Sequence, residues 1–245
     1  TEIYTLSLHD ALPISGSPAN GHLSDGAWSV QKILHVDTER RELLIQTAAR
    51  DPNINPYYRD VCKVNIDSGQ LTSLTSGNYD HVVQHPFHIN TMFYMTYSAD
   101  LDINRAGCNG VSPSGQYVIT TRSRVDTAPE SVLIDREGRE ILTIETADIS
   151  NLPTDWQWPE SVKLKASDGE TDIYGVVYRP PGFSSDQAYP ILDIASSLRA
   201  TCLLPSGSFG NSQFDGHNYY VGLSLAALGF IVVSITGRGT PGRNK

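Results

Sequence analysis

The sequence predicts a mixed fold, in which an all-β part is followed by the start of an α/β sheet. Two observations carry this prediction. From about Ala27 to Glu145, short apolar runs alternate with turn residues, which is typical of antiparallel strands. After Pro153 the pattern changes to a hairpin, a buried strand, a helix and a second buried strand. We therefore expect two structural parts, separated by a linker near Trp156 and Trp158.

The first part is defined by hairpins in which two apolar runs flank a polar turn. Such repeated hairpins are typical of β-propeller blades, although their spacing departs from the ~40–45 residues of a regular blade repeat. We interpret Ser76–Asn109, where aromatic residues stand between polar stretches, as an inserted or irregular blade. The three hairpins pair Ile33–Val36 with Leu43–Thr47, Val61–Ile66 with Leu71–Leu74, and Ser131–Ile134 with Ile141–Ile144.

The second part begins as a hairpin and continues as a parallel sheet. Val162–Ala166 and Asp172–Tyr178 flank an Asp-Gly turn, and Ile191–Ala195 is a short run of the kind buried on both faces. The apolar spacing predicts a helix over about His217–Leu228, followed by a strand at Phe230–Ile235. Strand, helix and strand in this order predict a parallel pair with a right-handed crossover. An antiparallel hairpin leading into a parallel sheet is how the α/β-hydrolase fold opens.

Composition excludes several partners. The chain has 245 residues, 39% of them apolar, and a formal charge of -9, which is typical of a soluble globular protein. Nucleic acid is excluded, because phosphate binding relies on clustered Lys and Arg. No run approaches the ~18–20 apolar residues that cross a bilayer. Cys62, Cys108 and Cys202 form no C-x-x-C pair, so we expect no zinc site and no cofactor.

One histidine-rich stretch has a spacing that suits a metal ion. His81, His85 and His88 follow Asp80 closely, but Pro86 interrupts any helix that would align them. No further residue supplies a fourth ligand of matching geometry. We therefore interpret the stretch as a solvated loop and expect no metal.

Several stretches resemble one known family in both parts of the chain. These stretches lie between about Ala27 and Lys245. Their order along the chain is similar to that in the dipeptidyl peptidase IV-like branch of the prolyl oligopeptidase family. The first group resembles the closing propeller blades, and the second resembles the first third of the α/β-hydrolase domain. The stretches are Asn55-Pro56-Tyr57-Tyr58, Val64–Asp67, Ser112–Tyr117 and Ser123–Thr127, then Asp172–Val176, Tyr178-Arg179-Pro180, Tyr189-Pro190, Leu228–Val233 and Gly237–Arg243.

The resemblance divides the chain into four segments. Residues 1–15 are expected to be a non-native or disordered tail, because His9–Ile14 matches one reading frame of a common sequencing adapter. Residues 16–152 would form the C-terminal part of the propeller and residues 153–161 the linker. Residues 162–245 would form a truncated N-terminal part of the hydrolase domain. The chain is thus interpreted as an internal fragment, and we expect it to be poorly soluble alone because its sheets would have unpaired edges.

The resemblance implies a serine peptidase whose propeller admits short peptides, often cut after proline or alanine. In that chemistry a serine is activated by histidine, an acid orients the histidine, and hydrogen-bond donors stabilise the oxyanion. The α/β-hydrolase serine lies on a G-x-S-x-G elbow, which is followed by the acid and then the histidine. Gly222–Ala226 is the nearest match, but it ends in Ala inside a predicted helix. We expect the nucleophile, acid and histidine beyond Lys245, and this chain to be inactive.

Two candidate site elements lie within the chain. Many relatives carry an oxyanion-donating tyrosine after the Tyr-Pro-led strand, and Ser196 stands at the aligned position. Three explanations stay open: another donor, a shifted alignment, or an impaired parent protein. Gly237, Arg238 and Gly239 are expected to form a tight loop at the carboxyl end of a strand, the edge where α/β sheets keep their sites. The family's preceding Asp is replaced by Thr236.

Two alternatives to a peptidase acting on peptide substrates stay open. Ser196 favours a non-catalytic relative, in which propeller and hydrolase shell bind a partner. The other is a hydrolase of non-peptide esters, because fold does not dictate substrate. Relatives are frequently dimers and some are exported, so the resemblance adds a homodimer and a periplasmic or secreted location as expectations for the parent protein.

Overall fold

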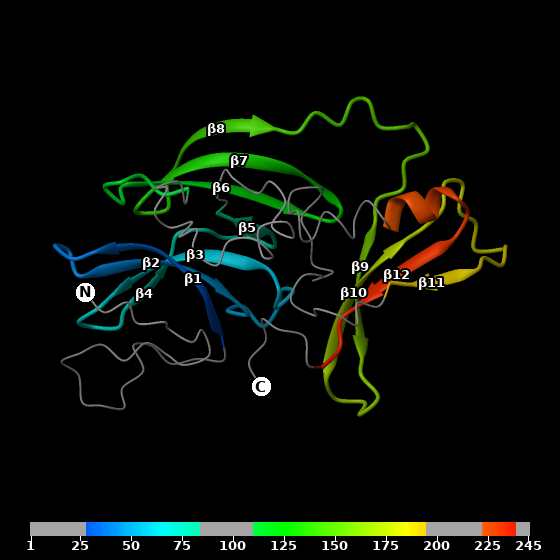
Figure 1. The fold of residues 1–245 in the computed structure, drawn as a ribbon, viewed down its shortest axis with the longest axis horizontal. Coiled ribbons are helices and arrows are strands. Elements are labelled where there is room, and N and C mark those ends of the chain that lie inside the picture. Colours follow the sequence, from blue (N-terminus) through cyan, green and yellow to red (C-terminus); the bar gives the residue numbers. More distant parts are fainter. Residues whose placement is uncertain (1–27, 84–109, 195–221, 239–245) are drawn as a thin grey trace, which may run out of the picture.

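The computed structural model describes residues 28–83, 110–194 and 222–238. These residues form three sheets of four strands each. The first two sheets lie side by side, and the third lies beyond the end of the second, reached by a long connection after β8 (Figure 1). Antiparallel pairing dominates all three sheets, in agreement with the predicted strand-rich first part.

The first sheet is an antiparallel meander with the order β1-β2-β3-β4. The predicted turn between β1 and β2 is held by Asp37, whose carboxylate accepts a hydrogen bond of 2.9 Å from the backbone N–H of Arg40. Asn65 caps the β3–β4 turn in the same way, accepting from the backbone N–H of Ser68 at 2.9 Å. The strands are β1 (Ser29–Asp37), β2 (Glu42–Ala48), β3 (Arg59–Asn65) and β4 (Leu71–Ser73).

The second sheet repeats this order as β5-β6-β7-β8. Its strands are β5 (Asp80–Val82), β6 (Tyr117–Arg124), β7 (Thr127–Asp135) and β8 (Glu140–Thr146). The stretch that we interpreted as an irregular blade therefore contributes a regular strand, β5, which pairs with β6. Three residues are too few to give a readable alternation, which is why the sequence pattern missed it. Residues 84–109 lie outside the described ranges.

The β7–β8 turn fastens the second sheet to the first. Gly138 has a φ of 82°, and a Cβ at this position would lie 2.7 Å from the carbonyl oxygen of Leu74. Only glycine fits that approach and that backbone conformation. In the same turn, Arg136 forms an ion pair with Glu42 of β2.

The two sheets bury a common core between them. Each sheet contributes the apolar side chains of one face, as expected from strand alternation. The fully buried members from the first and second sheets include Val61 and Val118, respectively. The complete cluster is Leu34, Leu44, Val61, Leu74, Val83, Val111, Val118, Val132 and Ile134.

An ion pair between a partly exposed arginine and a buried aspartate crosses from the first sheet to the second. Asp80 is completely buried and accepts from the Arg59 Nη2 at 2.6 Å, from its Nε at 2.9 Å and from its backbone N–H at 2.8 Å. Alongside it, Gln46 donates to the carbonyl of His81 at 2.9 Å. These bonds join β2 and β3 to β5 at the level of the core.

The third sheet has the order β11-β12-β10-β9. Its strands are β9 (Glu160–Lys165), β10 (Asp172–Tyr178), β11 (Ile191–Asp193) and β12 (Ile231–Ile235). The predicted β9–β10 hairpin and the predicted parallel pair of β11 and β12 are both present. Of the predicted helix, residues 222–227 are helical, and a Cβ on Gly222 would lie 2.7 Å from the Tyr178 ring, so this helix packs closely on β10.

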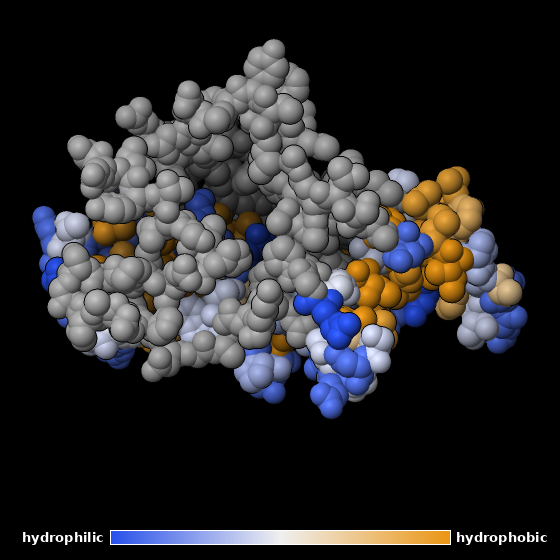
Figure 2. All heavy atoms as spheres, turned by 60° about the horizontal axis from the view of Figure 1, so that its bottom comes forward, coloured by the Kyte–Doolittle hydropathy of each residue, from blue (hydrophilic) through white to orange (hydrophobic). Residues whose placement is uncertain are grey.

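Apolar surface gathers at the end of the molecule formed by the third sheet (Figure 2). Ile191 on β11 and Leu228, which follows the helix, are 65% and 73% exposed. Within the described ranges, no helix has the length and apolar character needed to cross a membrane.

Removing the Asp80 carboxylate should strongly destabilise the protein. In Asp80→Asn the Arg59 guanidinium stays next to the core without its counter-charge, which costs roughly 3 kcal/mol in comparable sites. Urea unfolding followed by circular dichroism measures the change. Asp67→Asn, which breaks the exposed pair with Arg41, is the matched control and should cost less than about 1 kcal/mol. Equal effects of the two substitutions would contradict the structural role of the buried pair.

Asp60 should make stability depend on pH. Burial raises the pKa of this carboxyl from 3.8 to about 6, although Thr75 donates to it at 3.3 Å. Because the folded state holds the proton more tightly, Asp60 favours folding below pH 4 and loses that contribution as pH rises through 6. Asp60→Asn should therefore raise the free energy of unfolding at pH 7.5 by on the order of 2 kcal/mol. The variant and the parent chain should converge at pH 4, and a constant difference across this range would argue against the assignment.

Candidate functional site

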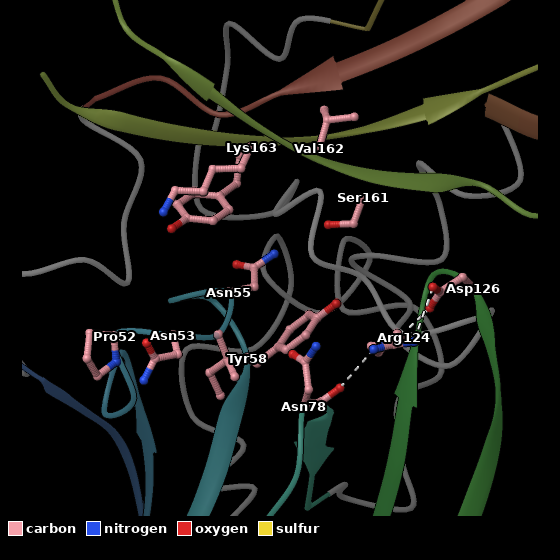
Figure 3. A pocket seen from close by; sticks show the side chains of 12 residues that line it. Pro52, Asn53, Asn55, Tyr58, Asn78, Arg124, Asp126, Ser161, Val162 and Lys163 are labelled. Carbon is pink, nitrogen blue, oxygen red and sulfur yellow. Dashed lines mark hydrogen bonds and ion pairs between the residues drawn. The ribbon is translucent and has the colours of Figure 1, made fainter. Parts of the chain in front are cut away.

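The described residues line an open pocket where the first two sheets meet the third. Its volume is about 260 Å³. One wall consists of residues 52–55 and Tyr58 from the first sheet, and another of Asn78, Arg124 and Asp126 near the second. The third sheet closes it with Ser161–Lys163 of β9 and Tyr174 of β10. In Figure 3, Ser161 and Lys163 lie on one side of this space and Asn55, Tyr58 and Arg124 on the other, while Val162 points away from it.

The tip of the β6–β7 hairpin builds one wall and also anchors the junction. Val125 at this tip is buried in the core of the third sheet, with Val176, Tyr178, Ala226 and Val232. Its two neighbours face the pocket instead, and Arg124 binds Asp126 through Nε at 2.8 Å and Nη2 at 3.2 Å. Arg124 also lies over the ring of Tyr79, 5.7 Å from its centroid, where cation–π attraction holds the guanidinium.

The opposite wall carries a lysine above an aromatic ring. Lys163 Nζ lies 5.7 Å from the centroid of the Tyr174 ring and 2.9 Å from the carboxylate of Asp172. Lys165 binds the same carboxylate at 2.7 Å. The two lysines hold the pKa of Asp172 below its usual value through these hydrogen bonds. One carboxylate is thus shared by two ammonium groups, which leaves this wall with an excess of positive charge.

Tyr58 lies between the two walls. The phenol is buried, and Ser161 of β9 lies across the junction from it (Figure 3). Burial raises the pKa of Tyr58 far above its ordinary value, so the hydroxyl stays protonated and can donate. Next to it, Tyr57 packs edge-on against Tyr174, with ring centroids 6.2 Å apart.

The loop after β12 contains the sequence-predicted site residues Gly237 and Arg238. Both follow the carboxyl end of β12, and Arg238 Nη1 lies 3.2 Å from the carboxylate of Asp168 in the β9–β10 turn. Asp168 also accepts from the hydroxyl and backbone N–H of Thr171, and these bonds hold its pKa well below the usual value. Ser196 and Gly239 lie outside the described residues.

Thr236, where the resembling family has an acid, has a structural partner here. Its hydroxyl lies 2.9 Å from the carbonyl of Tyr174 and accepts from the Tyr174 backbone N–H at 3.0 Å. The side chain therefore extends the pairing of β10 and β12 by one step.

Among the described residues, no group of three His, Cys, Asp or Glu side chains could hold a metal ion. His81 is buried, and its Nε2 lies 3.0 Å from the carbonyl of Ser76. Burial lowers the pKa of His81, which keeps the ring neutral at pH 7. His85 and His88 lie outside the described ranges.

Residues 2–105 match the family model for the dipeptidyl peptidase IV N-terminal region. No curated protein matches the chain. Among solved structures, dipeptidyl peptidase 4 of Porphyromonas gingivalis aligns with a TM-score of 0.64 at 19% identity, covering 94% of this chain and 28% of that one. A candidate dipeptidyl aminopeptidase IV of Bacteroides ovatus gives 0.62 at 20%, covering 91% and 27%. The fold is thus shared with these two structures, and residues 2–105 are similar to the N-terminal region of that family. The chain spans little more than a quarter of either structure.

Sequence reasoning did not identify the junction pocket. Its residues come from separate stretches spread between Pro52 and Tyr174, and none of these stretches forms a recognisable motif. One local signal was available, because Ser161, Lys163 and Lys165 alternate with apolar residues along β9 and so share a face.

Shortening Val125 should loosen the junction. Val125→Ala removes two methyl groups from the core of the third sheet and should cost about 2 kcal/mol. Amide hydrogen exchange should become faster in β10 and β12, measured by mass spectrometry. Val36→Ala at a 52% exposed position is the control and should change stability by less than about 0.5 kcal/mol. Unchanged exchange in β10 and β12 would mean that the tip does not anchor the junction.

Proposed function

We propose that this chain is part of a serine-type peptidase of the dipeptidyl peptidase IV-like group, which hydrolyses short peptides, often after proline or alanine. The observation that carries the proposal is the alignment of more than nine-tenths of the chain with two structures of that name. It is supported independently by the family match over residues 2–105.

The arrangement of the third sheet supports a hydrolase domain over residues 162–245. The parallel strands β11 and β12 end at the same edge, since parallel strands share their direction. Gly237 and Arg238 follow one of them, and Ser196 follows the other in sequence. Ligands of α/β sheets bind at this carboxyl edge. The exposed Ile191 and Leu228 are the kind of apolar surface that a continuing sheet would cover.

The proposed reaction is acyl transfer. A serine hydroxyl attacks the scissile carbonyl while histidine takes its proton, the amine leaves with that proton, and water then releases the acyl group. The sequence contains no G-x-S-x-G elbow, so we propose that the nucleophile, acid and histidine lie outside this chain. The chain alone should then be inactive.

Ser196 favours one alternative, a non-catalytic relative that binds a partner. A serine is shorter than the tyrosine that donates to the oxyanion in many relatives, and removal of one such donor lowers the rate by roughly a hundredfold or more.

The test is an assay of the whole reading frame that contains this chain. Chromogenic Ala-Pro and Gly-Pro amides should be cleaved, and a fluorophosphonate directed at serine should abolish the cleavage. The 245-residue chain, assayed in parallel as a control, should release no chromophore. A folded full-length protein that neither cleaves nor reacts with the fluorophosphonate would favour the non-catalytic alternative.

A further inference from the structure

Gly237 and Arg238, the described residues of the sequence-predicted site, do not line the junction pocket. The pocket is lined by β9 and the amino-terminal half of β10, whereas the sequence-predicted site residues follow β11 and β12. The pocket is therefore available for a ligand of its own.

The charges around the pocket favour an anion, although the whole chain carries a net charge of -9. The carboxylate of Asp126 is occupied by Arg124 through two bonds. A third nitrogen of Arg124, Nη1, makes only a long contact of 3.5 Å, to the carbonyl of Asn78. On the facing wall, Lys163 shares Asp172 with Lys165. Both walls thus present cationic groups, and no carboxylate among the lining residues is free of a cation.

The remaining lining groups suit a small organic molecule. Pro52, Ile54 and the Tyr174 ring provide apolar surface. A volume of 260 Å³ equals about nine water molecules at liquid density and lies below the ~300–1,000 Å³ of sites for drug-sized ligands. A ligand of this site is accordingly the size of a short carboxylic acid and not of a nucleotide.

We propose that the junction pocket binds a small organic carboxylate, with its anionic group beside Lys163 and its apolar part against Tyr174. In Figure 3, Asn55 and Tyr58 lie between Lys163 on one side of the pocket and Arg124 on the other. The Tyr58 hydroxyl and the Asn55 amide are neutral hydrogen-bond donors. They would fix the orientation of the carboxylate while the two cations attract it.

The test compares two molecules that differ in charge and two lysines that differ in position. N-acetylglycine and its neutral amide are titrated into the full chain by calorimetry at constant ionic strength. N-acetylglycine should bind and the amide should not. Lys163→Gln should weaken binding roughly tenfold, since it removes one charge-assisted contact. Lys63→Gln, which removes a lysine of β3 outside the pocket lining, should leave the affinity within about twofold.

Three results would overturn the proposal. Equal binding of the acid and the amide would mean that charge is not recognised. Equal losses in Lys163→Gln and Lys63→Gln would mean that only the general surface charge matters. Inorganic phosphate that binds as tightly as N-acetylglycine would mean that the pocket takes any anion. Circular dichroism of both variants verifies that they fold alike, and the outcome does not depend on peptidase activity.

Discussion

The core shared by the first two sheets is the constraint on which the rest of the described structure depends. A single four-stranded meander leaves one apolar face exposed to water and is marginal alone. Here each sheet covers the other, with Val61 and Val118 completely buried between them. The Arg59–Asp80 pair lies at the same level. A buried pair of this kind contributes little net stability, but only one alignment of the sheets satisfies both charges. The apolar faces thus drive the association, and the ion pair favours one register.

That register determines where the β6–β7 hairpin ends, and hence where the third sheet attaches. The hairpin extends beyond the core of its own sheet, and its tip delivers Val125 to a second core. Since β10 and β12 receive this side chain, the β9–β10 edge is held close to Tyr57 and Tyr58 of the first sheet. The pocket is the space that remains between these contacts. Its position follows from the packing of two cores and not from any local motif.

Local turn chemistry allowed much of the fold to be predicted. Asp67-Ser68-Gly69, Asp135–Gly138 and Asp168-Gly169 each mark a hairpin that the structure contains. The parallel pair of β11 and β12 was also predictable, because strand, helix and strand in sequence require it. The short strand β5 and the pocket could not be predicted. Asp80 and His81 are polar, and they are buried because Arg59 and Gln46 provide partners. Such partners become known only when the sheets are packed together.

The position of Val125 between two pocket residues has a mechanical consequence. Arg124 and Asp126 are its covalent neighbours. The position of the pocket wall is therefore coupled to the position of Val125 in the core of the third sheet. A ligand that displaces Arg124 would also displace Val125, which joins the second sheet to the third. Conversely, a tilt of the third sheet changes the width of the pocket at once. The β6–β7 hairpin thereby couples the geometry of the pocket to the packing of the third sheet, and the coupling is reciprocal.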